Sequence, residues 1–209
     1  MKICGNRSNA DVSACRTADY IGFIIEVSDS HRSVTVEEAK PLFKLASNFA
    51  KTVAVVRSPE AKLLERIDRL LHPDYIQVHT LLSGEEIIHL RNMISSGLIC
   101  LIAPDINRID EAAVIASASD MVIADTFSGG TSGGTGRVHD WNITSAIRER
   151  IHPARLMLSG GLNEKNVANA ISMVKPAAVD VSSGVENRGA KSIDLVRRFI
   201  ARARRNYNA

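Results

Sequence analysis

The sequence predicts an α/β protein that forms a single (β/α)8 barrel domain over residues 1–209. Eight short apolar runs recur along the chain, and segments with helical periodicity separate most of them. Most of the runs are continuously apolar, as in parallel strands that are covered on both faces. Alternating strands and helices form right-handed βαβ units, and eight such units in about 200 residues close into a barrel.

Each expected strand is a run of three to five mostly apolar residues. In chain order the strands are Lys2–Cys4, Ile21–Ile25, Thr52–Val56, Tyr75–Val78, Ile99–Ala103, Met121–Ala124, Leu156–Leu158 and Ala178–Val181. The competing architecture is an open doubly wound sheet, which typically carries a Gly-x-Gly-x-x-Gly motif after its first strand. Residues 5–8 lack that motif, so the barrel is favoured.

The expected helices carry Leu, Ile, Val and Ala at every third or fourth position, which gathers the apolar residues on one face. They are Val36–Phe49, Pro59–Leu71, Gly84–Ile94, Asp110–Ala118, Trp141–Arg150, Glu164–Val174 and Ser192–Ala203. Pro41 lies inside the first of these, so that helix is expected either to begin near Pro41 or to be kinked there. Asp140 directly precedes the Trp141 helix and is expected to be its N-cap.

Composition and charge limit the kinds of partner. The formal net charge is only +3, aromatic residues make up 4% of the chain, and no basic stretch is interleaved with them. Nucleic-acid binding is therefore not expected. The three cysteines have no metal-ligand spacing, so neither a metal site nor a disulfide framework is expected. Without a secretion signal or an apolar run of about 18 residues, we expect a cytoplasmic protein that binds no membrane, as a monomer or a homodimer.

Two segments after the last two strands predict a phosphate-binding site. Ser159–Leu162 and Asp180–Gly184 each place serine and glycine between an apolar run and a helical one. Backbone N–H groups, hydroxyl groups and helix N-termini bind phosphate, and barrels commonly hold phosphate at this position. Two ordinary glycine turns are the alternative interpretation. The candidate substrate-binding residues here are Gly160, Gly161, Asp180, Ser182, Ser183 and Gly184.

Cys4 and Asp125 are the candidate catalytic residues, because they lie at the ends of the first and sixth strands, where a barrel carries its active site. Five strands apart in a ring of eight, they can face each other across the barrel mouth. A thiol and a carboxyl group suit an isomerisation in which one group donates a proton and another accepts one. For Cys4 the alternative is a small buried residue without a catalytic role, which is also the expected state of Cys15 and Cys100. For Asp125 the alternative is a capping or surface carboxylate.

Two further side chains and one loop are candidates for substrate contact. Arg32 follows the second strand and either pairs with a substrate carboxylate or is a solvated loop arginine. His79 follows the fourth strand and either touches substrate or is hydrogen-bonded at the rim. Residues 126–139 contain five glycines, and long loops in compact domains are usually functional. Since no nucleotide-binding motif is present, the expected ligand is a phosphosugar or a related metabolite, with no cofactor.

Several motifs in combination resemble the phosphoribosylanthranilate isomerase family, over residues 2 to about 200. They are Lys2–Gly5, Gln77–His79, Gly133–Gly136 with Asp140–Trp141, Ser159–Asn163 and Val179–Glu186. The resemblance implies an Amadori rearrangement in tryptophan biosynthesis that needs no metal or cofactor. In that reaction N-(5-phospho-β-D-ribosyl)anthranilate becomes 1-(2-carboxyphenylamino)-1-deoxy-D-ribulose 5-phosphate.

The resemblance also implies a role for each candidate residue. Asp125 would be the general acid that protonates the furanose ring oxygen, and Cys4 the base that removes the proton from C2. Arg32 would bind the anthranilate carboxylate, and the glycine loop 126–139 would close over the Schiff-base intermediate. The phosphate would be held by the backbone at Gly160, Gly161, Ser182 and Ser183.

Two other functions remain open from the residues alone. One is another phosphosugar barrel enzyme, such as indole-glycerol-phosphate synthase or ribulose-phosphate epimerase. The synthase would need a catalytic lysine at a strand end and the epimerase metal-binding histidines with paired aspartates, and neither set can be placed in this sequence. The other is a non-catalytic barrel that binds a phosphosugar, which the fold alone does not exclude.

Overall fold

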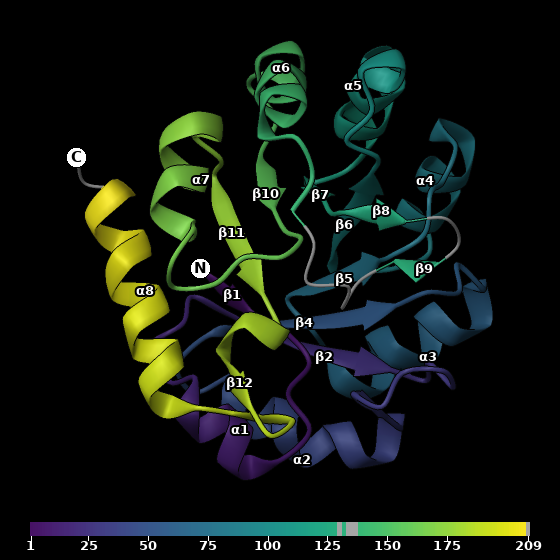
Figure 1. Ribbon diagram of the computed structural model, residues 1–209. Coiled ribbons are helices and arrows are strands. Elements are labelled where there is room, and N and C mark those ends of the chain that lie inside the picture. Colours follow the sequence, from purple (N-terminus) through teal and green to yellow (C-terminus); the bar gives the residue numbers. More distant parts are fainter. Residues whose placement is uncertain (129–130, 133–137, 208–209) are drawn as a thin grey trace.

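A computed structural model describes residues 1–128, 131–132 and 138–207, and its strands close into a barrel (Figure 1). The ring of parallel strands consists of β1 (Lys2–Ile3), β2 (Tyr20–Ile25), β4 (Lys51–Val56), β5 (Tyr75–Val78), β6 (Gly97–Ile102), β7 (Met121–Ala124), β10 (Leu156–Leu158) and β11 (Ala178–Val181). The first strand, β1, pairs with both β11 and β2, and this closes the ring. The predicted (β/α)8 barrel is therefore confirmed.

The helices follow one another around the outside of the ring in chain order (Figure 1). They are α1 (Asn9–Ala14), α2 (Val36–Ala46), α3 (Ala61–Leu71), α4 (Gly84–Arg91), α5 (Ile109–Ala118), α6 (Trp141–Ile151), α7 (Val167–Val174) and α8 (Ile193–Tyr207). Helix α1 was not predicted from the sequence, because six residues are too few to show helical periodicity.

Short strands and 3-10 turns lie in the connections between the main strands and helices. They are β3 (Ser33–Val34), the 3-10 turns η1 (Ile106–Arg108) and η2 (Ser183–Val185), the pair β8 (Phe127–Ser128) and β9 (Thr131–Ser132), and the hairpin β12 (Glu186–Asn187) with β13 (Ala190–Lys191). Of these, η2 and the β12–β13 hairpin follow the last barrel strand directly. The hairpin brings the charged side chains of Glu186 and Lys191 to the barrel mouth.

The apolar core consists of two clusters, because alternate strand residues point to opposite faces of the ring. On β4, Val53 and Val55 belong to an inner cluster, whereas Ala54 and Val56 pack with the helices in an outer one. The burial of both faces explains why the strands are continuously apolar in the sequence. Cys4 belongs to the inner cluster and Ile3 to the outer one, so the side chain of Cys4 faces the barrel interior.

Helix α2 begins before Pro41. Thr35 accepts a hydrogen bond from the backbone N–H of Glu38, and the Glu38 carboxylate accepts one from the backbone N–H of Thr35. This capping box starts the helix at Val36, and Pro41 lies on its exposed side, where the Glu37 carbonyl that loses its partner can bind water. Asp140 is the N-cap of α6, as predicted, and accepts from the backbone N–H of Asn142.

Candidate active site

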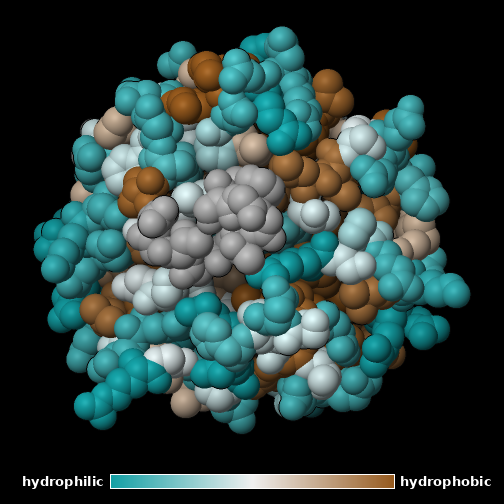
Figure 2. All heavy atoms as spheres, turned by 45° about the vertical axis from the view of Figure 1, so that its right-hand side comes forward, coloured by the Kyte–Doolittle hydropathy of each residue, from teal (hydrophilic) through white to brown (hydrophobic). Residues whose placement is uncertain are grey.

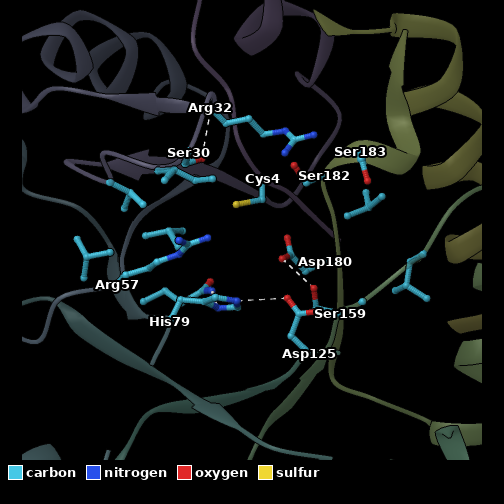
Figure 3. Close-up of a pocket in the computed structure, with 18 of the residues that line it drawn as sticks. Cys4, Ser30, Arg32, Arg57, His79, Asp125, Ser159, Asp180, Ser182 and Ser183 are labelled. Carbon is cyan, nitrogen blue, oxygen red and sulfur yellow. Dashed lines mark hydrogen bonds and ion pairs between the residues drawn. The ribbon is translucent and has the colours of Figure 1, made fainter. Parts of the chain in front are cut away.

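A pocket at the carboxyl ends of the barrel strands collects nearly all of the predicted site residues (Figure 3). Gly184 is the exception and does not line it. Gln77 and Ser159, which were not among the predicted catalytic or substrate-binding residues, also line the pocket. The predicted residues that line the pocket are Cys4, Arg32, His79, Asp125, Gly160, Gly161, Asp180, Ser182 and Ser183.

Cys4 lies directly after β1 and is 6% exposed. Its backbone N–H donates to the carbonyl of Val181 at 2.9 Å, which extends the pairing of β1 with β11 by one residue. Burial raises the pKa of the Cys4 thiol above its usual value, and the Lys2 ammonium opposes this increase. Cys15 and Cys100 are fully buried away from the pocket, and burial raises the pKa of each thiol to about 12.

A buried ion pair lies beside Cys4. The Lys2 side chain is fully buried, and its Nζ lies 3.2 Å from Oδ1 of Asp180. The two residues are direct neighbours in the register of β1 and β11, although 178 positions separate them in the chain. The other carboxylate oxygen of Asp180 accepts a hydrogen bond from the Ser159 hydroxyl at 3.4 Å. This pair was not predicted from the sequence, because a lysine within a short apolar run does not reveal its partner.

Asp125 follows β7 and faces His79 across the pocket (Figure 3). Its Oδ2 lies 3.4 Å from Nε2 of His79, and its Oδ1 accepts from the backbone N–H of Thr126 at 2.7 Å. Burial acts to raise the pKa of Asp125, but the hydrogen bond and charge of His79, together with the N–H of Thr126, outweigh it and lower the pKa. The resting carboxyl group is therefore ionised at neutral pH.

Gln77 orients the His79 ring. Its Nε2 lies 3.1 Å from Nδ1 of His79, and an amide nitrogen can only donate, so Nδ1 is the acceptor. This leaves the ring hydrogen on Nε2, which is the nitrogen nearest to Asp125. His79 thus contacts Gln77 through Nδ1 and the Asp125 carboxylate through Nε2, at a position where it also lines the pocket.

Arg32 is held by a partly buried cluster of three charges. Its Nε and Nη2 donate to the two carboxylate oxygens of Glu186 at 2.9 and 2.8 Å. Lys191 Nζ donates to the same carboxylate at 2.7 Å and to the Ser182 carbonyl at 3.2 Å. Burial acts to raise the pKa of Glu186, but Arg32 and Lys191 outweigh it and lower the pKa to about 2. The β12–β13 hairpin, which the sequence analysis did not predict, supplies Glu186 and Lys191.

The glycines of the two polar segments have different structural roles. Gly160 and Gly161 have φ angles of +90° and +64°, in the left-handed region that side chains disfavour. A Cβ atom on Gly160 would lie 2.3 Å from Oγ1 of Thr126 and 3.0 Å from Oδ1 of Asp125. A Cβ atom on Gly184 would lie 2.0 Å from the carbonyl oxygen of Leu162. Gly184 therefore allows the two segments to pack together and does not face the pocket.

The glycine loop 126–139 falls partly outside the described residues, since 129–130 and 133–137 are not described. Its proposed closure over the pocket stays a prediction. At its carboxyl end, His139 lies 3.2 Å from Oγ1 of Thr126 and 2.7 Å from Oγ1 of Thr144, which ties the end of the loop to its start and to α6.

The face in Figure 2 is mainly hydrophilic, with apolar residues in scattered patches. Within residues 1–128, 131–132 and 138–207, no cluster of three or more His, Cys, Asp or Glu side chains could hold a metal ion. None of the described helices is long and apolar enough to cross a membrane.

Comparisons with known proteins identify the family. The sequence model described as N-(5'phosphoribosyl)anthranilate (PRA) isomerase matches residues 1–202. The chain belongs to this isomerase family. The N-(5'-phosphoribosyl)anthranilate isomerase of Methanothrix thermoacetophila is 37% identical over 206 residues, which cover 98% of this chain and 97% of the relative. The resemblance stated from the sequence motifs is therefore confirmed.

Solved structures of family members share the fold of this chain. The phosphoribosyl anthranilate isomerase of Thermotoga maritima is 29% identical and superposes with a TM-score of 0.84, covering 97% of both chains. Another solved family member, 28% identical with a TM-score of 0.80 over 97% of both chains, is in complex with reduced 1-(o-carboxyphenylamino)-1-deoxyribulose 5-phosphate.

Proposed function

We propose that this protein catalyses the Amadori rearrangement of N-(5-phospho-β-D-ribosyl)anthranilate to 1-(2-carboxyphenylamino)-1-deoxy-D-ribulose 5-phosphate, a step of tryptophan biosynthesis. Membership of the isomerase family supports the reaction class. The observation that carries the proposal is one pocket that contains a thiol, a carboxyl group paired with histidine, and two segments of serine and glycine. These are an acid, a base and an anion site within reach of a single substrate.

The phosphate group would bind between the ends of β10 and β11. The left-handed turn at Gly160 and Gly161 leaves backbone N–H groups available at the pocket wall, and Ser182 and Ser183 add hydroxyl groups opposite. The Lys191 ammonium, which donates to the Ser182 carbonyl, adds positive charge behind this segment. This arrangement suits a dianionic phosphate group.

The anthranilate carboxylate would bind Arg32. Glu186 occupies the Nε and Nη2 side of the guanidinium. Nη1 has no hydrogen-bond acceptor among the described residues, so that edge can receive a second carboxylate. The three charges of Arg32, Lys191 and Glu186 sum to one positive charge, which an anionic substrate group would balance. Arg32 is thus fixed before substrate arrives, which reduces the entropic cost of binding.

Asp125 would donate a proton to the furanose ring oxygen as the ring opens to the Schiff base. A general acid must carry a proton, whereas the lowered pKa leaves Asp125 ionised in the free pocket. Substrate that fills the pocket removes water and strengthens the desolvation that raises this pKa. Asp125 would take this proton from water as the substrate enters the pocket, and the Nε2–H of His79, 3.4 Å away, would hold the carboxyl group in place.

Cys4 would then remove the proton from C2 of the Schiff base. The sulfur takes the proton, and the C–H electron pair stays on the substrate to form the enaminol, which tautomerises to the ketone product. The thiolate is the form that can accept this proton. Cys4 lines the pocket on β1 and Asp125 on β7, so the acid and the base would reach the substrate from different sides.

The test follows the loss of anthranilate fluorescence when purified protein is mixed with freshly generated phosphoribosylanthranilate. Rapid loss in the wild type, absent in Asp125→Asn, would support both the isomerase and its acid. Asp110→Asn is the matched control, because Asp110 is an exposed carboxylate on α5 outside the pocket. Fluorescence loss no faster than spontaneous decay would overturn the proposal and favour a different phosphosugar or a binding role.

A further inference from the structure

Lys2 is a buried charge that the proposed reaction does not use. Its side chain is fully enclosed, and burying an ammonium group is costly unless a partner compensates. Asp180 supplies one partner at 3.2 Å, but the geometry of this contact is not that of a hydrogen bond. Lys2 Nζ is therefore a buried donor without a hydrogen-bond acceptor in the part of the chain that the structure describes.

Lys2 and Cys4 lie on the same face of the first strand. They are two residues apart, so both side chains point into the barrel, with Lys2 deeper and Cys4 at the mouth. Gly22 on the neighbouring strand β2 makes room for both. A Cβ atom at Gly22 would lie 3.0 Å from Sγ of Cys4 and 3.0 Å from Cε of Lys2, so both side chains border the same space.

We propose that Lys2 is a positioning residue that stabilises the thiolate form of Cys4 from inside the barrel, with Asp180 as the opposing charge that limits this effect. The inference rests on the proposed role of Cys4 as the base. When Cys4 takes the C2 proton, the negative charge on sulfur disappears, while Lys2 keeps its three protons throughout. Lys2 therefore acts on the availability of the base and does not touch the substrate.

The charges around Cys4 support this assignment. Lys2 on β1 and Lys191 on β13 lower the pKa of the Cys4 thiol, whereas burial and Asp180 on β11 raise it. Cys4 also interacts electrostatically with Arg32, which lines the same pocket. Burial alone would lower the pKa of Lys2, but Asp180 and Cys4 keep it above its ordinary value, so Lys2 remains an ammonium group. His79 and Asp125 face the same pocket from the other side.

The two members of the ion pair should therefore have opposite effects on Cys4. Lys2→Met removes an attractive charge and should reduce the thiolate fraction at a given pH. Asp180→Asn removes a repulsive charge and should increase it. An ionic neighbour within about 4–6 Å changes a pKa by roughly 1–3. At a pH below the pKa of the thiol, each variant should therefore change the thiolate fraction about tenfold or more. A purely structural role of the pair predicts a change in the same direction for both variants, because both break the same contact.

The experiment measures the ionisation of Cys4 directly. In a Cys15→Ala, Cys100→Ala background Cys4 is the single remaining thiol, and the pH dependence of its alkylation by iodoacetamide reports its thiolate fraction. Lys51→Met is the matched control, since it removes the same charge from an exposed position on β4. The double variant Lys2→Met, Asp180→Asn leaves no uncompensated buried charge and should lie between the single variants.

Opposite shifts in Lys2→Met and Asp180→Asn, with none in Lys51→Met, would establish the proposal. Shifts in the same direction, or no shift, would overturn it. If Lys2→Met does not fold, Asp180→Asn can be compared with the double variant. These two proteins differ only at Lys2, so the difference in their thiolate fractions measures the effect of the Lys2 charge. Since alkylation does not require turnover, a protein without isomerase activity would fail the fluorescence test and could still show the opposite shifts.

Discussion

Replacement of Gly160 by alanine should lower the free energy of unfolding for two reasons, the backbone conformation of this residue and the steric overlap of the new Cβ atom. The φ angle of +90° disfavours any side chain, at a cost of about 1–2 kcal/mol in the free energy of unfolding. The new Cβ atom would also lie 2.3 Å from Oγ1 and 2.8 Å from the backbone nitrogen of Thr126. Overpacking of this kind typically costs about 1–3 kcal/mol. Gly160→Ala should therefore lower the free energy of unfolding by about 2–5 kcal/mol.

Gly189→Ala is the matched control. Gly189 has a φ angle of +79°, and nothing lies within 4 Å of the position that its Cβ atom would occupy. This variant carries the backbone cost alone, about 1–2 kcal/mol. Urea denaturation of both variants measures the difference. If Gly160→Ala is no less stable than Gly189→Ala, the steric reasoning is wrong.

The activity of Gly160→Ala provides a second measurement. The displaced Thr126 donates its N–H to Oδ1 of Asp125 at 2.7 Å, so a shift there moves the proposed acid. We expect kcat to fall well below that of Gly189→Ala, whose substitution lies in the turn between β12 and β13. Equal kcat values in the two variants would show that Thr126 does not position Asp125.

Three further predictions concern the charged and proton-transfer groups. Glu186→Gln should destabilise the fold by about 1–3 kcal/mol at pH 7, because Arg32 and Lys191 lose their partly buried counter-charge. The pKa of Glu186 is lowered from 4.5 to about 2, so the stability that its ionised carboxylate contributes to the fold is complete above pH 4.5 and is lost as pH falls toward 2. Urea titrations at several pH values should show this loss in the wild type only. Arg32→Lys cannot hold two carboxylates by paired bonds, so KM should rise with little change in kcat, and a fall in kcat alone would contradict its binding role. Cys4→Ser and Asp125→Asn should each lower kcat about 10²–10⁴-fold with little change in KM, and a raised KM at near-normal kcat in steady-state assays would refute their roles in proton transfer.

The barrel and the position of its pocket could be predicted from the chain because both depend on local patterns. Strands such as Met121–Ala124 are apolar at every position, and this fits only strands that are covered on both faces. In a parallel barrel all strand ends that carry polar residues meet at one edge, so Cys4, His79 and Asp125 could be assigned to one site from their positions alone. The same reasoning assigned Ser159–Leu162 and Asp180–Gly184 to one phosphate-binding site.

The charge pairs were decided only by the tertiary structure. Lys2 meets Asp180 because the first and last strands of the ring pair in a particular register, and no local pattern encodes that register. Arg32 meets Glu186 because a short hairpin after β11 folds back over the mouth, 154 positions further along the chain. Gly184 proved to be a packing residue because Leu162 of the neighbouring segment lies against it. Periodicity along one segment determines which face is buried, whereas electrostatic and steric contacts depend on which segments become neighbours when the ring closes.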